Sequence, residues 1–367
     1  MQVKYMELPK QFKDERLWAV VREQLELTHF VGGEVIEVFE KNLAALCGTP
    51  YALGLNSGTD ALFLGLVALG VGRGDEVITA PNSFISTAGA AVAVGAKPVF
   101  VDVGPDYNMD VSKIEPAITP RTKAIIAVHL TGNPADMPAI LPIARKYKLA
   151  VLEDAAQAVC ASIGSQQAGS FGDLGCFSLH PLKNLNVAGD GGAVTMNSEQ
   201  LYLKIKQLRN HGLKNRDELD FFGYNSRLDS IQAAIANYGL KSLEDVVRKH
   251  IHNAALYDSL LADLDGCVTV PPRRADVKQV YHTYIVQVAD REKLIAFLAQ
   301  NGIETKVHYP IPLHLQRPAL EMGYKRGDFP VCEAQSRRIL TLPVHRFLAD
   351  EQIEYVAAMI KKFYGKA

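Results

Sequence analysis

The chain has 367 residues, of which 48% are hydrophobic and 22% charged, and its net charge is −1 at pH 7. This composition is that of an ordinary globular protein, and the length fits one large and one smaller domain. No basic block occurs, so nothing in the charge pattern favours nucleic acid or a membrane surface as a partner.

The cysteines and the N-terminal sequence indicate in which cellular compartment the protein is expected. Five cysteines make an odd number, and none belongs to a CxxC pair. Free thiols in a reducing environment are the simplest account. Residues 1–7 lack a signal-peptide core, and the apolar stretch 84–96 is too short and too polar to span a bilayer. We therefore expect a cytoplasmic protein, with no metal ion and no membrane partner.

Apolar periodicity predicts two N-terminal helices, at 10–27 and about 35–46. Strands and helices then alternate. Strands are expected at 51–55, 76–80, 98–103, 123–128 and 149–153, and helices at 61–69, 85–94, 110–117 and 137–147. Nearly continuous apolar strands that alternate with helices indicate an α/β domain with a mostly parallel sheet covered on both faces. Ligands of such sheets lie beyond the carboxyl ends of the strands.

The second half of the chain predicts a smaller unit. An apolar run at 193–196 precedes a helix at 199–210, a polar loop at 211–220, and a long helix from about 230 to 264. Further on, we expect a strand at 281–288, a helix at 291–301, a strand at 304–307 and a last helix at 350–364. These elements predict a large domain at 1–245 and a small α+β domain at 246–367.

The chemistry of the chain centres on Asp154 and Lys183. Asp154 ends a buried strand, and Lys183 lies in an irregular loop 29 positions later. This pair suits pyridoxal phosphate, because a carboxylate keeps the cofactor's ring nitrogen protonated and a buried lysine is a neutral amine able to form a Schiff base. The alternatives are a helix cap for Asp154 and a solvated side chain for Lys183.

Four motifs carry a family resemblance. They are Glu-Asp-Ala-Ala-Gln at 153–157, Gly-Ser-Phe-Gly-Asp-Leu-Gly-Cys-Phe-Ser at 169–178, His-Pro-Leu-Lys-Asn at 180–184, and Gly-Asp-Gly-Gly-Ala-Val at 189–194. The chain resembles, over nearly its whole length, the DegT/DnrJ/EryC1/StrS sugar aminotransferases. That resemblance implies a fold type I enzyme that uses pyridoxal 5′-phosphate, with a seven-stranded sheet in the large domain and a smaller C-terminal α+β domain.

The cofactor residues are assigned partly from position and partly from the resemblance. Gly58 and Thr59 begin a helix after a strand, where free backbone N–H groups bind an anion, although a capped helix without a ligand is the alternative. The resemblance assigns them to the cofactor phosphate together with Ser178. It also implies that Phe84 stacks on the pyridine ring and that Gln157 lies near the ring hydroxyl.

Other residues are assigned to the substrate or to a second subunit. The resemblance places His308 and Tyr309 near the substrate, and His180 lies three positions before the catalytic Lys183. It also implies a homodimer with shared active sites, in which Asn225 reaches the partner's phosphate and Arg227 a substrate carboxylate. An interface ion pair for Arg227 and a packing role for His180 are the alternatives. His129 follows a strand, and we expect a structural hydrogen bond there.

The resemblance implies amino transfer to a keto group of a nucleotide-linked sugar, with L-glutamate as donor. Lys183 argues against the family's dehydratases, which carry a histidine there, and against a regulator that keeps only the fold. No GxGxxG follows a strand, so a Rossmann dehydrogenase is disfavoured. The motif at 189–192 is like that of enzymes acting at C3 of the sugar, whereas His180-Pro181 also occurs in C4 enzymes. We favour C3 and keep C4 as the alternative.

Overall fold

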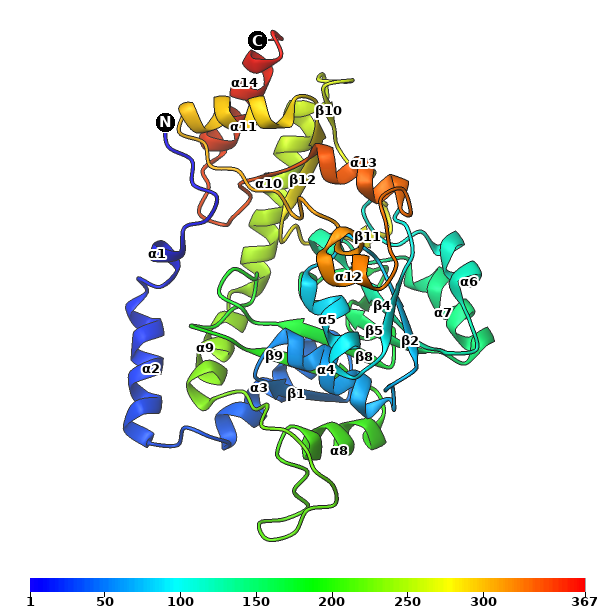
Figure 1. The fold of residues 1–367 in the computed structure, drawn as a ribbon. Coiled ribbons are helices and arrows are strands. Elements are labelled where there is room, and N and C mark those ends of the chain that lie inside the picture. The colour runs from blue at the N-terminus through cyan, green and yellow to red at the C-terminus, as the bar shows by residue number, and fades with distance from the viewer. Residues whose placement is uncertain (367) are drawn as a thin grey trace.

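The structure, a computed structural model, describes residues 1–366 and contains a seven-stranded sheet at its centre (Figure 1). The pairing shows six strands in one direction and only β9 in the other. The α/β fold with a mostly parallel sheet is thereby confirmed. In spatial order the strands are β1 (Tyr51–Leu55), β9 (Gly192–Met196), β8 (Leu174–Ser178), β5 (Ala150–Asp154), β4 (Thr122–Val128), β2 (Glu76–Thr79) and β3 (Lys97–Phe100).

Helices cover both faces of this sheet. One face packs against α4 (Gly58–Ala68), α5 (Ile85–Ala93) and α8 (Glu199–Leu208), and the other against α3 (Glu34–Cys47), α7 (Met137–Tyr147) and α9 (Ser230–Leu240). Side chains alternate between the faces along β5, so Leu152 lies in the α4 core and Val151 in the α7 core. By the same alternation, Asp154 faces the α4 side and Glu153 the opposite side.

The N-terminal helix expected at 10–27 is broken in two. It forms α1 (Leu8–Gln11) and α2 (Glu15–Leu27), because the Asp14 carboxylate accepts a hydrogen bond from the Arg16 N–H at 3.0 Å and caps a new helix. The helix expected from 230 to 264 is also two helices, α9 and α10 (Leu243–Leu261). Figure 1 shows α2 beside α9 and α10 rising from α9 to the upper part of the molecule.

The C-terminal part has its own antiparallel sheet and core. The sheet consists of β10 (Val268–Thr269), β12 (Tyr284–Val288) and β13 (Ile339–Leu342), and it packs with α10, α11 (Arg291–Gln300) and α14 (Asp350–Phe363). Val3 joins this core from the other end of the chain. The strand expected at 304–307 is absent from the described residues, where Lys306 forms only an isolated bridge with Thr341.

Smaller elements connect the two parts. A third sheet joins β6 (Ser162–Ile163) and β7 (Gln166–Gln167) to β11 (Val277–Lys278). The helices α12 (Arg317–Glu321) and α13 (Pro330–Arg338) supply Ala319 and Cys332 to the core under β2 and β3. The short α-helix α6 (Ile114–Ala117) and the 3-10 helices η1 (Val111–Lys113), η2 (Leu130–Gly132) and η3 (Leu313–Leu315) complete the elements. The boundary at 245/246 stays a prediction.

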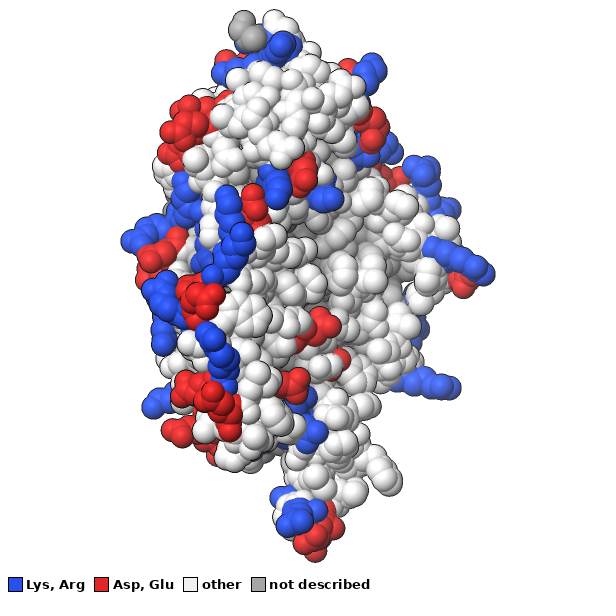
Figure 2. Space-filling model, turned by 90° about the vertical axis from the view of Figure 1, so that its left-hand side faces the viewer, with Lys and Arg blue, Asp and Glu red and all other residues white. Residues whose placement is uncertain are grey.

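The surface carries charges of both signs. On the face shown in Figure 2, basic and acidic side chains alternate along one side, and an area with few charged side chains lies beside them. Among residues 1–366, no helix is long and apolar enough to cross a membrane.

Candidate active site

A cavity of about 400 Å³ lies beyond the carboxyl ends of β2, β5 and β8. Strand ends, helix N-termini and the loop that carries Lys183 all contribute to its wall. Ten of the twelve residues predicted for the site line it, namely Gly58, Thr59, Phe84, Asp154, Gln157, Ser178, His180, Lys183, His308 and Tyr309. The structure therefore brings together segments as far apart in the chain as Gly58 and Tyr309.

The carboxylate of Asp154 is buried in the wall of the cavity. The Thr87 hydroxyl donates to Oδ2 at 2.7 Å, and the Ala156 N–H approaches Oδ1 at 3.3 Å. Ser83 Oγ lies 2.6 Å from Thr87 Oγ1 and continues the chain of hydroxyl groups. A carboxylate has room for about four hydrogen bonds, so Asp154 keeps the capacity to bind a further donor.

The Lys183 loop is held by hydrogen bonds from both sides. The Lys183 N–H donates to the His180 carbonyl at 2.8 Å, and the Asn186 side chain donates to the Lys183 carbonyl at 2.7 Å. The Asn184 amide donates to the Val280 carbonyl at 3.1 Å. Burial lowers the pKa of Lys183 from 10.5 to about 8, and the nearby Asp154 opposes that shift. The amine is therefore far more easily neutralised than an ordinary lysine.

The start of α4 provides a cradle for an anion. The N–H groups of Gly58 and Thr59 belong to the first helical turn and have no acceptor inside the helix. Thr59 Oγ1 and Ser86 Oγ, from the first turns of α4 and α5, are 2.8 Å apart. A Cβ at Gly58 would lie 2.8 Å from Ser178 Cβ, so only glycine allows the helix to approach this strand.

Phe84 and Tyr309 form an aromatic part of the cavity wall. Their ring centroids are 5.9 Å apart, and the Phe84 side chain is 50% exposed, so a flat ligand can reach it. Gln157 Oε1 accepts a hydrogen bond from the Thr131 N–H at 2.7 Å. Burial raises the pKa of Tyr309 to about 12, with Asp154 adding to the shift and Gln157 opposing it.

The two predicted histidines occupy different depths. His180 is exposed at the cavity's edge, where its Nδ1 accepts from the Leu182 N–H at 3.3 Å. His308 is half-buried, and its Nδ1 lies 2.9 Å from Thr341 Oγ1. Burial, with Lys183 and Lys306, lowers the pKa of His308 to about 4. At neutral pH it is an uncharged imidazole.

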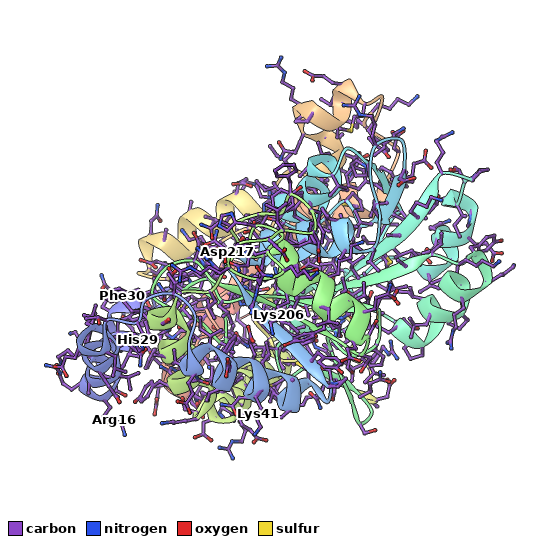
Figure 3. All side chains as sticks on the ribbon, turned by 90° about the horizontal axis from the view of Figure 1, so that it is seen from below. Arg16, His29, Phe30, Lys41, Lys206 and Asp217 are labelled. Atoms are coloured by element: carbon purple, nitrogen blue, oxygen red, sulfur yellow. The ribbon has the colours of Figure 1, made fainter. Side chains whose placement is uncertain are left out.

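Asn225 and Arg227 lie away from this cavity within the single chain. Asn225 is exposed, and Arg227 Nη1 donates to Asn210 Oδ1 at 2.9 Å. Arg227 lines a second cavity of about 760 Å³, together with Lys41 of α3 and Lys206 of α8, which Figure 3 labels. The chain's own fold does not bring these two residues to Lys183.

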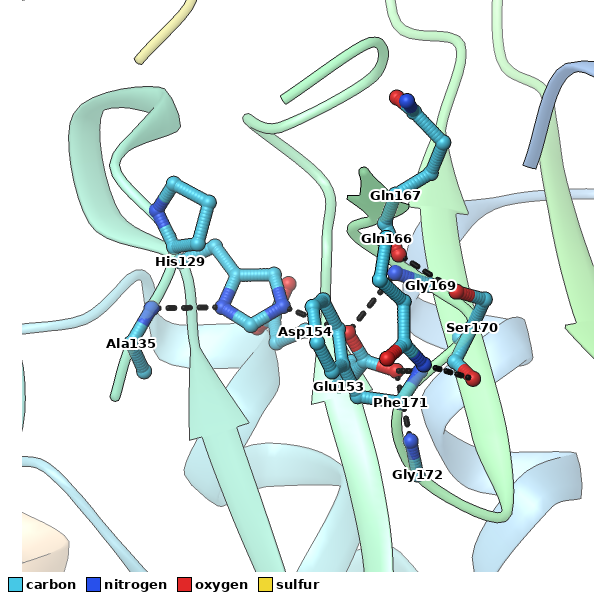
Figure 4. Close-up of polar contacts among 12 residues, drawn as sticks. His129, Ala135, Glu153, Asp154, Gln166, Gln167, Gly169, Ser170, Phe171 and Gly172 are labelled. Atoms are coloured by element: carbon cyan, nitrogen blue, oxygen red, sulfur yellow. Dashed lines mark hydrogen bonds and ion pairs between the residues drawn. The ribbon is translucent and has the colours of Figure 1, made fainter. Parts of the chain in front are cut away.

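His129 has the structural role expected for it. It is buried on the other face of the sheet, where Nε2 lies 2.9 Å from Glu153 Oε2 and Nδ1 accepts from the Ala135 N–H at 3.0 Å (Figure 4). Since Nδ1 is an acceptor, the ring proton is on Nε2 and is donated to Glu153.

Several cavity residues escaped the sequence analysis. Ser86 lines the cavity, and Thr87 is the donor to the Asp154 carboxylate. Both follow Phe84 at a helix start, so the position after β2 was a usable signal for them. His282 and Thr283 also line the cavity. They lie in a stretch that the sequence predicts as a strand, and only the tertiary fold shows that they line the cavity of Lys183.

The residues present fit pyridoxal phosphate. The cavity has a lysine of lowered pKa, a buried carboxylate with unused acceptor capacity, and hydroxyl and N–H donors at the start of α4 that suit a phosphate. Its volume is within the usual range of cofactor sites. Among residues 1–366, no group of three or more His, Cys, Asp or Glu side chains is placed to hold a metal ion.

The chain is similar in sequence and fold to known aminotransferases. The model of the DegT/DnrJ/EryC1/StrS aminotransferase family matches residues 11–361. The UDP-N-acetyl-3-dehydro-α-D-glucosamine 3-aminotransferase of Acidithiobacillus ferrooxidans is 43% identical over 92% of this chain and 91% of its own. A Geobacillus stearothermophilus protein named pleiotropic regulatory protein is 39% identical over 99% of both chains. The crystal structure of S. venezuelae DesV in complex with a ketimine intermediate has a TM-score of 0.97 and 36% identity, covering 100% of this chain and 99% of that one.

Proposed function

This chain belongs to the DegT/DnrJ/EryC1/StrS aminotransferase family, and we propose that it transfers an amino group from L-glutamate to the C3 keto group of a nucleotide-linked sugar. It is a pyridoxal phosphate-dependent transaminase. The observation that carries the proposal is the pairing, in one cavity, of the Lys183 amine with the buried Asp154 carboxylate.

When bound, pyridoxal phosphate supplies an electron-withdrawing ring that stabilises negative charge on the carbon next to the transferred nitrogen. The chain's own groups do the rest. Asp154 holds a proton on the ring nitrogen, Thr87 fixes the orientation of that carboxylate, and the donors of Gly58, Thr59 and Ser178 hold the phosphate. Lys183 Nζ takes the α-proton of the amino donor and later returns it, since its lowered pKa suits both roles.

Substrate recognition is proposed for the edge of the cavity. His308 and Tyr309 are uncharged at neutral pH and can hydrogen-bond sugar hydroxyl groups, while exposed His180 meets the larger part of the substrate. Support for C3 comes from the name of the Acidithiobacillus relative and the motif at 189–192. Amination at C4 is the alternative. The name of the Geobacillus relative supports a regulatory role as a further alternative. A regulator, however, has no need of the Lys183 amine.

We also propose a homodimer with shared sites. Asn225 and Arg227 are outside the cavity of their own chain, which supports their action in a partner's site. A Lys183→Ala chain and an Asn225→Ala/Arg227→Ala chain should each be nearly inactive alone. Co-refolded mixtures should regain up to about a quarter of wild-type activity, because one site of a heterodimer in a two-fold symmetric dimer collects neither defect. No recovery despite proven subunit exchange would place both residues in their own chain's site.

The substrate is tested by direct turnover. The purified protein is incubated with glutamate and a panel of 3-keto and 4-keto nucleotide sugars, and the products are identified by mass and NMR. We expect a 3-amino sugar together with 2-oxoglutarate, and no product with Lys183→Ala. A 4-amino product would move the reaction to C4. No amine product from any sugar, with the cofactor bound, would favour the regulatory role.

A further inference from the structure

Two polar atoms beside Lys183 are buried and have no hydrogen-bond partner among residues 1–366. They are Nδ1 of His282 and Oγ1 of Thr283, and both side chains line the Lys183 cavity. Leaving such an atom without a partner is unfavourable, so native proteins rarely keep two adjacent ones without a use. Neither residue has a role in the scheme above.

The backbone around His282 is held in place from both sides. Val280 donates its N–H to the Gly132 carbonyl at 3.0 Å and accepts from the Asn184 amide at 3.1 Å. The Tyr281 carbonyl lies 2.8 Å from His250 Nδ1. The segment that carries His282 is therefore anchored by the fold and does not belong to a loose loop.

Gly132 allows the segment that carries His282 to pack close to it. Its φ is +83°, and a Cβ there would lie 2.6 Å from a Val280 methyl group and 2.8 Å from the Gln157 carbonyl oxygen. Any larger residue would move the segment that carries His282. The bond from Asn184, the residue after Lys183, ties the same segment to the catalytic loop. The fold thus fixes His282 and Lys183 relative to one another.

Lys183 needs a hydrogen-bond acceptor during the amino transfer reaction. When its Nζ takes the α-proton of the donor, an ammonium forms on a partly buried side chain, and a cation that has lost part of its hydration requires acceptors. With its proton on Nε2, the imidazole of His282 has a lone pair on Nδ1. We propose that Nδ1 of His282 accepts a hydrogen bond from the Lys183 ammonium and holds that proton in place until Lys183 returns it.

The inference rests on the proposed function, because it assigns Lys183 the transferred proton. His282 is a positioning residue, since it acts on the reaction through Lys183. The pKa of His282 agrees with this assignment. Burial is the largest cause that keeps this pKa well below its usual value of 6.5, and the neighbouring Lys183, His308, His250 and His180 lower it further. The ring is therefore neutral and able to accept at physiological pH.

The test compares three substitutions of His282. Asn places an amide oxygen near the position of Nδ1, Gln places it near that of Nε2, and Leu provides no acceptor. The readout is the pKa of Lys183 in the cofactor-free chain, measured by competitive acetylation of its lysines over a pH series with peptide mass spectrometry. The other ionisable side chains that line the Lys183 cavity are Asp154, His180, Asp190, His308 and Tyr309, and they are unchanged in all three variants.

An acceptor stabilises the ammonium and so raises its pKa, which means that removing the acceptor must lower it. We expect His282→Leu and His282→Gln to move the Lys183 pKa below its value of about 8, and His282→Asn to keep it. The kcat should fall about tenfold or more in the Leu and Gln variants, with little change in the KM for glutamate, and should be largely retained in the Asn variant.

Thr283→Val is the matched control, because it removes the neighbouring unpartnered hydroxyl at constant shape. It should leave the Lys183 pKa unchanged. Equal losses in the Asn and Gln variants, or an unchanged Lys183 pKa in His282→Leu, would overturn the proposal. The measurement needs neither cofactor nor sugar. A wrong sugar or a wrong carbon in the proposed function would therefore leave this pKa result as it is.

Discussion

Two carboxylates next to each other on β5, Glu153 and Asp154, have opposite surroundings. Glu153 is fully buried and accepts from the N–H groups of Gly169, Phe171 and Gly172 at 2.7–2.8 Å, and from His129 (Figure 4). Asp154 points to the other face and has one strong donor, the Thr87 hydroxyl. The chain satisfies the first carboxylate completely and leaves the second open towards a cavity.

This difference in hydrogen bonding distinguishes a carboxylate with a structural role from one that can act in catalysis. Four donors compensate for the desolvation of Glu153, so its charge holds the 169–172 turn against the sheet and has nothing left to offer a ligand. Asp154 is buried as well, but its spare acceptor capacity lies beside Lys183. A buried charge that its own chain does not saturate is the better candidate for catalysis.

The largest effect is expected on the open side, at Lys183. Lys183→Ala removes both the covalent attachment point and the proton carrier, and turnover should fall by about 10⁴-fold or more. The wild-type protein should be yellow, and borohydride should bleach its absorption band and fix the cofactor to the peptide that contains Lys183. Lys362→Ala, on the exposed side of α14, is the control and should behave as wild type. Near-normal transamination by Lys183→Ala would refute the mechanism.

Asp154→Asn should separate activity from stability. The change is nearly isosteric and the Thr87 hydroxyl keeps an oxygen to bind, so we expect unfolding to become easier by no more than about 2 kcal/mol. Turnover should fall by about a hundredfold or more, because the neutral amide no longer holds a proton on the ring nitrogen. Urea unfolding of the cofactor-free protein and steady-state kinetics measure the two effects. Normal turnover would mean that another group holds that proton.

Much of this contrast was predictable from the sequence. A buried strand ending in Glu-Asp places the two side chains on opposite faces, since side chains alternate along a strand. Helix starts after strands pointed to Gly58 and Thr59, and both line the cavity. These inferences succeed because they depend on local periodicity and on the common edge at which parallel strands end.

The remaining features depend on contacts that no local pattern encodes. His282 faces the cavity only because Gly132, 150 positions earlier, lets its segment approach. The strand expected at 304–307 does not form, since its only ladder contact is the bridge between Lys306 and Thr341. Asp14 breaks the helix expected at 10–27, although its capping ability was readable in the sequence. Asn225 and Arg227 need a second chain before their role is testable.

The pH dependence of cofactor capture sharpens the contrast further. Only the neutral amine reacts, so attachment should become faster as pH rises and should level off above the Lys183 pKa of about 8. At pH 7 roughly 300 times more of this amine is neutral than of an ordinary lysine. Attachment to the cofactor-free protein is followed by absorbance, with a simple alkylamine as reference for the cofactor's own titration. A rate that still rises near the pKa of an ordinary lysine would contradict the lowered value.

Of these variants, Glu153→Gln is expected to have the smallest effect on turnover and the largest effect on the free energy of unfolding. The amide keeps one acceptor oxygen but turns two hydrogens towards groups that are themselves donors, the N–H groups of Gly169, Phe171 and Gly172. Opposed donors cannot pair, so the free energy of unfolding should fall by about 3 kcal/mol. Urea unfolding of the cofactor-free protein avoids the stabilisation that a bound cofactor adds.

The control for Glu153→Gln is Asp154→Asn, the same change of charge one residue further along the strand. The two variants should differ clearly: Glu153→Gln loses more stability and keeps its turnover per folded molecule, whereas Asp154→Asn loses less stability and most of its turnover. The reason is that the Glu153 carboxylate is saturated by its own chain and lies across the sheet from Lys183. If Glu153→Gln lost turnover while its unfolding midpoint stayed at the wild-type value, the carboxylate would be acting through the sheet on the cavity, and saturation would no longer distinguish a structural charge from a catalytic one.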